Sequence, residues 1–203
     1  GLIVGNRFKK DMKVKGGLKS NILQLMVIVA LALSTSSSVC AQQKRTAAIC
    51  EQHIKAASED EGIPIGLLYA VATTESGSGG RLQPYALNIE GEPILVKTRA
   101  EALSAFESAR EDGKKLIDLG CMQINYHYHH SGFSSASDML DPQKNVHYAA
   151  KHLKSLQIRH GTWTEAVARY HAGPKNKSAQ NRYVCKVIEN LVKANFGSWT
   201  SDS

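Results

Sequence analysis

The sequence predicts a mainly α-helical domain of the α+β class that carries a small β-hairpin insertion. Apolar residues recur at helical spacing in several segments, and most of these segments begin with Thr, Pro or Asn, which favour helix starts. By contrast, residues 78–98 are rich in Gly, Pro and Asn and hold only short apolar runs. The chain has 203 residues, enough for one domain of ordinary size.

Two helices are expected before the insertion. The first extends from a Thr46 cap to about Glu59 and has apolar residues along one side. The second begins at Pro64 and continues to Glu75, where Gly77 and the glycines after it end the helix.

The insertion is expected to hold a hairpin that turns at residues 90–93, followed by a helix from Thr98 to Asp112. Residues 116–125 then form a short apolar extended stretch. This region gives the domain its minor β element.

Three helices are expected after the insertion. Asn145 caps one, Thr162 caps the next, and the last runs from about Ala179 to Ala194. Their apolar positions at helical spacing are Val146, Ala149, Ala150, Leu153 and Leu156, then Trp163, Ala166, Val167 and Tyr170, then Tyr183, Val184, Val187, Ile188 and Leu191.

Glu75 is the most informative single residue. It continues the apolar face formed by Leu67, Leu68, Val71 and Ala72, at the C-terminal end of its helix. Burial and the negative helix end both disfavour the ionised carboxylate, so the pKa of Glu75 is expected to rise. A general acid that must hold its proton near neutral pH needs this environment. The alternative is a mobile surface side chain at a helix end.

The positive charge of the chain is concentrated at its beginning. The formal charge is +7, but residues 1–41 hold six basic residues and one acidic residue, which leaves 19 basic and 17 acidic residues in the remainder. Because the main part of the chain is nearly neutral, a nucleic-acid partner is not expected.

The leading segment has the pattern of a secretory signal peptide. Met12 is a plausible start, basic residues follow, and residues 22–33 form an apolar run before Val39 and Ala41, which suit cleavage after Ala41. An uncleaved anchor ranks second because the run is short for a membrane span. Cys40 also suggests a lipoprotein signal, but a β-branched residue such as Val39 just before the cysteine suits that signal poorly. Residues 42–203 would then form the mature domain, in the periplasm or outside the cell.

Three segments resemble the signature segments of soluble lytic transglycosylases, which are lysozyme-like enzymes that cleave bacterial peptidoglycan. They are residues 75–77 (Glu-Ser-Gly), 118–125 (Asp-Leu-Gly-Cys-Met-Gln-Ile-Asn) and 168–174 (Ala-Arg-Tyr-His-Ala-Gly-Pro). The resemblance covers roughly residues 47–192 and looks closest to the small enzymes associated with type IV secretion and related envelope machines. Components of such a machine are therefore possible partners, besides the glycan strands.

The resemblance implies roles for individual residues. Glu75 matches the sole catalytic carboxylate, and Tyr170 matches a tyrosine whose hydroxyl lies near it. Residues implied to orient the site or to line the sugar groove are Ser76, Gly120, Met122, Gln123, Asn125 and His171. Two positions depart from the usual pattern, since His171 replaces an asparagine and Cys121 replaces a leucine.

The implied reaction cleaves the β-1,4 bond between N-acetylmuramic acid and N-acetylglucosamine and gives a 1,6-anhydro sugar without water. Glu75 would act first as the acid and then as the base, so neither a second carboxylate, nor a metal, nor a cofactor is needed. Two alternatives stay open: a hydrolase of goose-lysozyme type in which Asp118 positions water, and a catalytically silent wall-binding assembly factor. The His127, His129 and His130 cluster is interpreted as a polar groove edge rather than a metal site.

Export would place Cys50, Cys121 and Cys185 in an oxidising compartment, where one bridge can form. The resemblance favours Cys50 with Cys121, because related members with two cysteines place them at these sites. Cys185 would then be a buried free thiol. The rival pairing joins Cys50 to Cys185, and the sequence leaves both open.

We expect the mature protein to begin at Gln42, because signal peptidase would cut after Ala41. N-terminal sequencing of the exported protein measures this. A periplasmic protein that keeps Met12 would show that the segment is an anchor.

Overall fold

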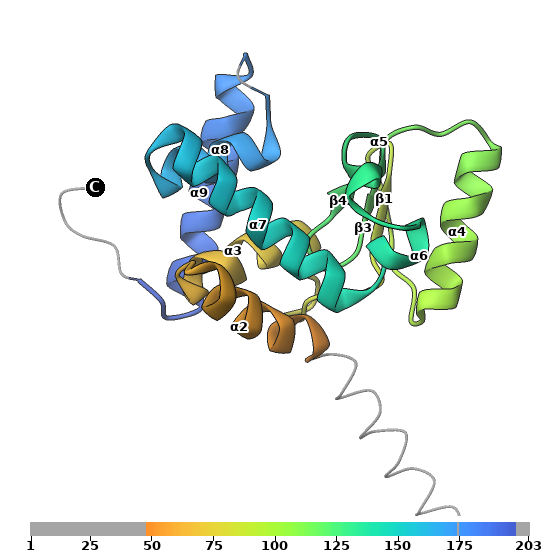
Figure 1. Ribbon diagram of the computed structural model, residues 1–203, viewed down its shortest axis with the longest axis horizontal. Coiled ribbons are helices and arrows are strands. Elements are labelled where there is room, and N and C mark those ends of the chain that lie inside the picture. Colours follow the sequence, from red (N-terminus) through yellow and green to blue (C-terminus); the bar gives the residue numbers. More distant parts are fainter. Residues whose placement is uncertain (1–47, 174, 198–203) are drawn as a thin grey trace, which may run out of the picture. The chain divides into compact units, whose positions relative to one another are not determined.

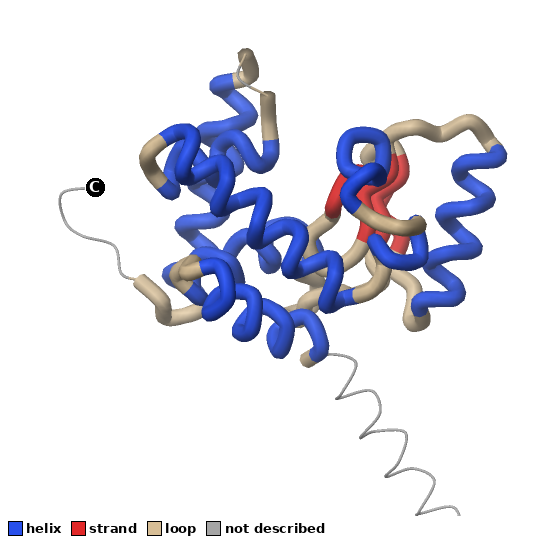
Figure 2. Tube along the Cα trace, viewed as in Figure 1, coloured by secondary structure: helices blue, strands red, loops and turns tan. Residues whose placement is uncertain are grey.

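The computed structural model describes residues 48–173 and 175–197 (Figure 1). The chain divides into two compact units, residues 1–43 and 44–203, and the first lies outside the described residues, as do Thr46 and the expected signal segment. Within the described part, helices dominate and are accompanied by one small antiparallel sheet, so the predicted fold class is confirmed (Figure 2). No helix in the described ranges is long and apolar enough to cross a membrane.

The first two described helices lie close to their predicted positions. Helix α2 spans Ile49–Glu61, follows Ala48, and ends at Gly62, whose φ of 60° is the left-handed conformation that glycine adopts freely. Helix α3 spans Ile65–Ser76 and follows Pro64. It contacts α2 on one side and the last helix, α9 (Lys177–Lys193), on the other. Because α3 is packed between two helices, apolar residues occur around most of its circumference.

The predicted hairpin is confirmed, and it belongs to a larger sheet than expected. Strands β1 (Leu87–Ile89) and β2 (Glu92–Ile94) pair in antiparallel fashion around a two-residue turn, so the turn is shorter than predicted. The extended stretch predicted at 116–125 instead folds back on itself as β3 (Ile117–Leu119) and β4 (Ile124–Asn125). The strand order is β2-β1-β3-β4.

Helix α4 (Arg99–Glu111) lies within the range predicted for it, and Thr98 is its cap. The Thr98 hydroxyl accepts a hydrogen bond from the Glu101 amide, and the Glu101 carboxylate accepts one from the Thr98 amide. This reciprocal arrangement satisfies two amides that the first helical turn leaves free.

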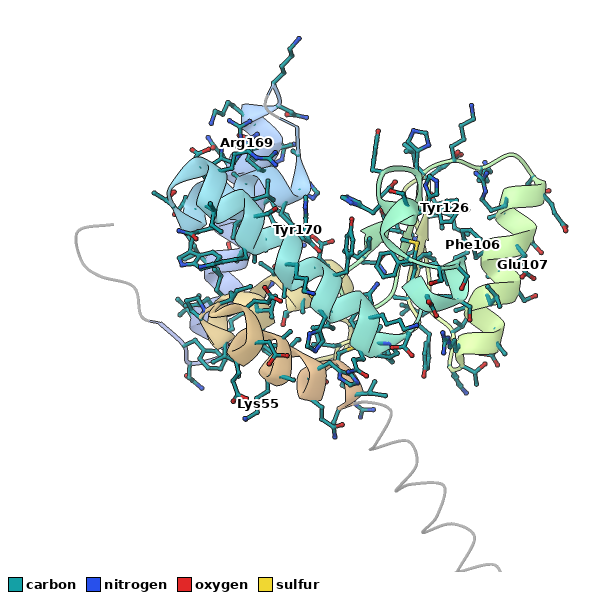
Figure 3. The ribbon with its side chains drawn as sticks, in the orientation of Figure 1. Lys55, Phe106, Glu107, Tyr126, Arg169 and Tyr170 are labelled. Carbon is teal, nitrogen blue, oxygen red and sulfur yellow. A yellow bond between two sulfur atoms is a disulfide. The ribbon has the colours of Figure 1, made fainter. Side chains whose placement is uncertain are left out.

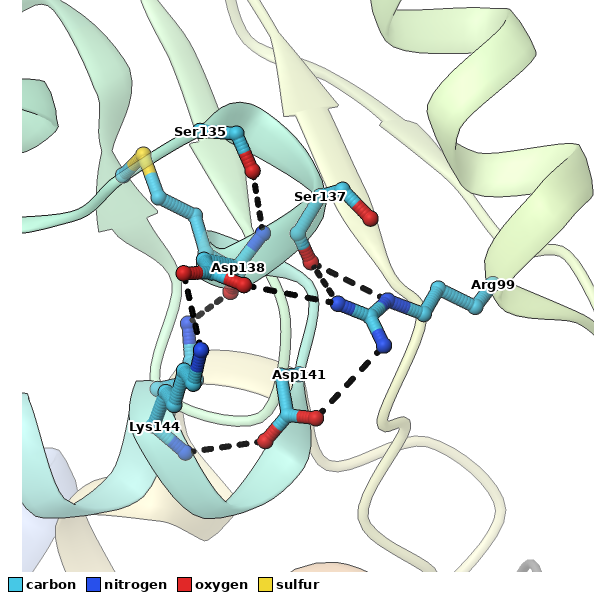
Figure 4. Close-up of polar contacts among 8 residues, drawn as sticks. Arg99, Ser135, Ser137, Asp138, Asp141 and Lys144 are labelled. Carbon is cyan, nitrogen blue, oxygen red and sulfur yellow. Dashed lines mark hydrogen bonds and ion pairs between the residues drawn. The ribbon is translucent and has the colours of Figure 1, made fainter.

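A cluster of charges ties the start of α4 to the segment that leads into α7 (Figure 4). The Arg99 guanidinium donates to the Ser137 carbonyl in the short helix α6 (Ala136–Met139) and lies 3.5 Å from Asp141. Asp138 in turn pairs with Lys144 at 2.8 Å. These contacts connect the insertion to the helices that follow it.

The cap predicted for the next helix was wrong. Helix α7 runs over Pro142–His160, and its cap is Asp141, whose side chain accepts a hydrogen bond from the Lys144 amide. Asn145 lies inside the helix and is fully buried. Its amide is used for contacts outside α7, which explains why a residue typical of caps occurs there.

The last two helices complete the core. Helix α8 (Trp163–His171) starts at the predicted Thr162 cap, and α9 starts after Asn176, two residues earlier than expected. Helix α7 contacts α2 and α8, and α9 contacts α3 and α8.

Along the chain, strand β4 is followed by the short helix α5 (Tyr126–His129) and a 3-10 turn at His130–Gly132. The Tyr126 and Phe106 rings pack edge to face, with centroids 4.8 Å apart (Figure 3).

A disulfide joins Cys50 in α2 to Cys121 in the β3–β4 connection, which is the pairing that the resemblance favoured. The prediction that Cys185 is buried was wrong, because it is exposed. The buried positions on α9 are Gln180, Tyr183 and Val187. Cys185 follows Tyr183 by two residues, which turns it about 200° away from that face.

Replacing Cys50 and Cys121 together by alanine is expected to lower the free energy of unfolding by about 2–4 kcal/mol, because the bridge constrains the unfolded chain. Cys185→Ser is the matched control, and we expect a change within about 0.5 kcal/mol at this exposed position. Denaturant titration measures both. Peptide mapping of the non-reduced protein should recover Cys50 linked to Cys121, and a Cys50–Cys185 peptide would contradict this pairing.

Candidate active site

A cavity of about 470 Å³ lies beside the C-terminal end of α3. Its lining is mostly polar or aromatic and comes from α3, the sheet, α5, α7 and α8. The lining residues are Glu75, Asn88, Asp118, Gln123, Ile124, Asn125, Tyr128, His129, His152, Tyr170 and His171. Five of them, Glu75, Gln123, Asn125, Tyr170 and His171, are site residues predicted from the sequence.

Glu75 has the raised pKa that its position predicts. Burial raises the pKa of its carboxyl to about 7, and the nearby Asp118 charge adds to this effect. The hydrogen bond from Tyr183 and the charge of Lys186 act in the opposite direction, and burial outweighs them. Near neutral pH the carboxyl is therefore divided between its protonated and ionised forms, as a group that both gives and takes a proton requires.

The tyrosine that contacts the acid is Tyr183 rather than Tyr170. The Tyr183 hydroxyl, on α9, donates to Glu75 Oε1 at 2.5 Å. The Tyr170 hydroxyl donates to the Met122 carbonyl at 2.9 Å. Tyr170 still lines the cavity, and the Glu75 charge contributes to the raised pKa of Tyr170. Tyr170 thus connects α8 to the β3–β4 loop, while Tyr183 holds the carboxylate.

Three other predicted residues shape the site without lining the cavity. The Ser76 hydroxyl is buried and donates to the Cys121 carbonyl at 2.7 Å, which joins the end of α3 to the β3–β4 loop. Gly120 has a φ of 80°, and a Cβ there would lie 2.8 Å from the Asn145 amide nitrogen. Met122 belongs to the same loop and is fully buried.

The β3–β4 loop is held by two amide side chains. Asn145 donates to the Leu119 and Met139 carbonyls, each at 2.8 Å, and its oxygen accepts from the Met122 amide at 2.9 Å. Gln123 adopts a left-handed φ of 46°, and its side chain donates to the Ala86 and Gly120 carbonyls. All of the hydrogen bonds of the Asn145 amide are therefore directed to backbone around the site.

Asp118 faces the cavity and is fixed by its strand neighbour. It pairs with Asn125 across the β3–β4 ladder, and the Asn125 amide donates to Asp118 Oδ1 at 2.7 Å. Burial raises the pKa of Asp118, and this hydrogen bond partly offsets the effect. Both residues line the cavity that holds Glu75.

The histidine cluster at 127–130 lies on α5 and the turn after it, rather than on the strand that could present His127 and His129 to one metal. His129 lines the cavity with His152 of α7, whereas His127 and His130 are exposed. Burial lowers the pKa of His152 to about 4 and also lowers that of His129, so both are neutral at pH 7. Among the described residues, no group of three His, Cys, Asp or Glu side chains could hold a metal.

Sequence reasoning missed Tyr183, Asn145 and His152 as parts of the site. Tyr183 occupies an apolar stripe and Asn145 was interpreted as a helix cap, so each has an ordinary structural explanation. A tyrosine hydroxyl inside an apolar stripe needs a partner when it is buried. This need was the one available signal for Tyr183.

A half-buried glutamate with a raised pKa, in a cavity lined by polar and aromatic side chains, is typical of enzymes that cleave glycosidic bonds. The Transglycosylase SLT domain profile matches residues 52–192, and the protein belongs to this family. Its members are lytic transglycosylases that act on peptidoglycan. No curated protein and no solved structure matched the chain in the corresponding comparisons.

Tyr183→Phe is expected to raise the pKa of Glu75 further, because the hydrogen bond that stabilises its carboxylate is lost. The protonated form of Glu75 then persists to higher pH, so the alkaline limb of the plot of rate against pH should shift to higher pH. A pH profile of kcat on purified sacculi measures this.

Tyr170→Phe is the matched control, because its hydroxyl donates to Met122 rather than to Glu75. We expect its alkaline limb to stay in place. Equal shifts in the two variants would contradict the separate roles of the two tyrosines.

Proposed function

We propose that the protein is an exported lytic transglycosylase that cleaves the β-1,4 bond between N-acetylmuramic acid and N-acetylglucosamine, with Glu75 as its single acid and base. The observation that carries this proposal is the environment of Glu75, whose pKa is raised to about 7 beside a cavity that can take a glycan chain. Membership of the Transglycosylase SLT domain family supports the same substrate.

In the first half of the reaction, protonated Glu75 gives its proton to the glycosidic oxygen. The bond between the anomeric carbon and that oxygen breaks, and the N-acetylglucosamine side leaves with a new hydroxyl. The acetamido group of the muramoyl residue stabilises the positive charge at the anomeric carbon. Burial favours the protonated acid before this step, and the Tyr183 hydrogen bond supports the carboxylate that the step creates.

In the second half, the Glu75 carboxylate takes the proton of the C6 hydroxyl on the same muramoyl residue. The C6 oxygen attacks the anomeric carbon and closes the 1,6-anhydro ring. Glu75 regains the proton that it gave, and no water is consumed. One carboxyl group therefore suffices for the complete cycle.

Asp118 supports a second candidate, a hydrolase of goose-lysozyme type. It lines the cavity together with Glu75, and Asn125 holds its carboxyl group in place. In a hydrolase, Asp118 would position a water molecule for attack on the anomeric carbon. The products separate the two reactions, because hydrolysis adds one water and the anhydro product does not.

Export is part of the proposal and is supported by the signal-peptide pattern that ends at Ala41. A disulfide between Cys50 and Cys121 fits an oxidising compartment. The resemblance to enzymes of type IV secretion suggests that the protein opens the wall for an envelope-spanning machine. Co-purification of such a machine with the tagged protein tests this part.

Glu75→Gln is expected to fold normally and to lose wall-cleaving activity by a factor of about 10²–10⁴, because an amide cannot deliver a proton. Release of soluble muropeptides from purified sacculi measures the rate, and mass spectrometry identifies anhydro ends. Glu107→Gln, at an exposed position on α4, is the matched control and should remain active (Figure 3).

Three outcomes would contradict the proposal. Substantial activity in the Glu75→Gln variant would show that Glu75 is not the acid. Products one water heavier would establish the hydrolase. No release by the wild-type protein would favour a silent wall-binding factor.

A further inference from the structure

A second cavity, of about 240 Å³, adjoins the catalytic cavity on the side of α9. Glu75 and His171 line both cavities, so the acid forms part of the wall between them. The parallel rings of His171 and Tyr183, with centroids 4.3 Å apart, form another part of the lining. A substrate that occupies the first cavity therefore lies next to the second.

The second cavity carries two cations that have no ion-pair partner within the described residues. Arg182 and Lys186 line it and lie one helical turn apart on α9. The other two basic residues of α9 are paired, Lys177 with Glu165 and Lys193 with Glu189. Glu75 is the only acidic residue in the lining, and its own pKa of about 7 makes it a weak counter-charge.

The geometry of Arg182 and Lys186 favours an anionic group. The Arg182 guanidinium donates to the Ser178 hydroxyl at 2.6 Å, which leaves its other N–H groups free for a planar acceptor. Lys186 lies near enough to Glu75 for its charge to lower the pKa of that carboxyl. It also lines a further cavity of about 390 Å³ that includes Arg81, so the positive lining continues along α9.

The proposed substrate supplies such a group at the right place. Each muramoyl residue bears a short peptide, and this stem peptide has free carboxylates. The muramoyl residue whose anomeric carbon is attacked must sit against Glu75. Its stem therefore starts within a few ångströms of the wall that the two cavities share, and two residues of extended chain span roughly 7 Å.

We propose that Arg182 and Lys186 bind a carboxylate of the stem peptide on the muramoyl residue at the scissile bond, so that the enzyme prefers peptide-bearing glycan to naked glycan. This inference rests on the proposed function and adds a determinant of substrate choice to it. Arg182 and Lys186 are both exposed, so their contacts with an anion are strongest at low salt and are screened as ionic strength rises.

The test compares kcat/KM on three glycans: strands with intact stems, naked strands freed of stems by an amidase and then amidated at the lactyl carboxylate that this cleavage exposes, and strands whose stem carboxylates have been amidated chemically. The wild-type protein should favour intact stems about tenfold over both of the others at low salt. The double variant Arg182→Gln/Lys186→Gln should lose this preference, so that the ratio of its kcat/KM on intact stems to that on each of the other two glycans falls to about one. Lys97→Gln/Lys115→Gln, two exposed cations outside the lining of these cavities, removes the same charge and should keep the preference.

The amidated substrate needs only the wild-type protein, so the test does not depend on folding of the double variant. Equal rates of the wild-type protein on intact and amidated stems would overturn the inference and leave the proposed function intact. A preference for intact stems that survives in the double variant would assign recognition to other residues and would also overturn it. Failure to cleave any of the three glycans would instead reject the proposed function.

Discussion

The buried side-chain amide of Asn145 fixes the position of the β3–β4 loop, and the site is built around that loop. Its three hydrogen bonds reach the backbone of two separate segments, so α7 and the loop cannot move independently. Other helices add one contact each: α3 through Ser76, α8 through Tyr170, and α2 through the bond from Cys50. The close approach of Asn145 also requires glycine at position 120. The shape of the loop therefore depends both on the residues that surround it and on Gly120 within it.

The pKa of the Glu75 carboxyl is governed by a balance between burial and hydrogen bonding. Burial alone would keep Glu75 protonated and would make it a poor base in the second half of the proposed reaction. The hydroxyl of Tyr183 stabilises the ionised form, and the charge of Asp118 opposes it. As a result, the pKa of Glu75 is about 7, near neutral pH. The neighbouring His129 and His152 stay neutral at pH 7, because burial lowers the pKa of both side chains.

The elements with strong local signals were predictable from the sequence, and the contacts between distant segments were not. Pro64, Thr98 and Thr162 marked helix starts correctly because capping and proline geometry act within a few residues. Asn145 was misassigned because the same amide can cap a helix or hold a loop, and only the tertiary structure decides between them. Tyr183 was recognised as a core residue, yet its hydroxyl partner lies 108 positions away in the sequence, on another helix.

The insertion also affects how one molecule meets another. Strand β2 is one edge of the sheet, and an unpaired edge offers a template on which a second chain can add a strand. Here the edge strand is only three residues long, and its middle residue is Pro93, which has no backbone N–H to donate. Glu92 places a charge beside it. The hairpin therefore extends the sheet next to the site, and the edge that it forms is poorly suited to pairing with another copy of the protein.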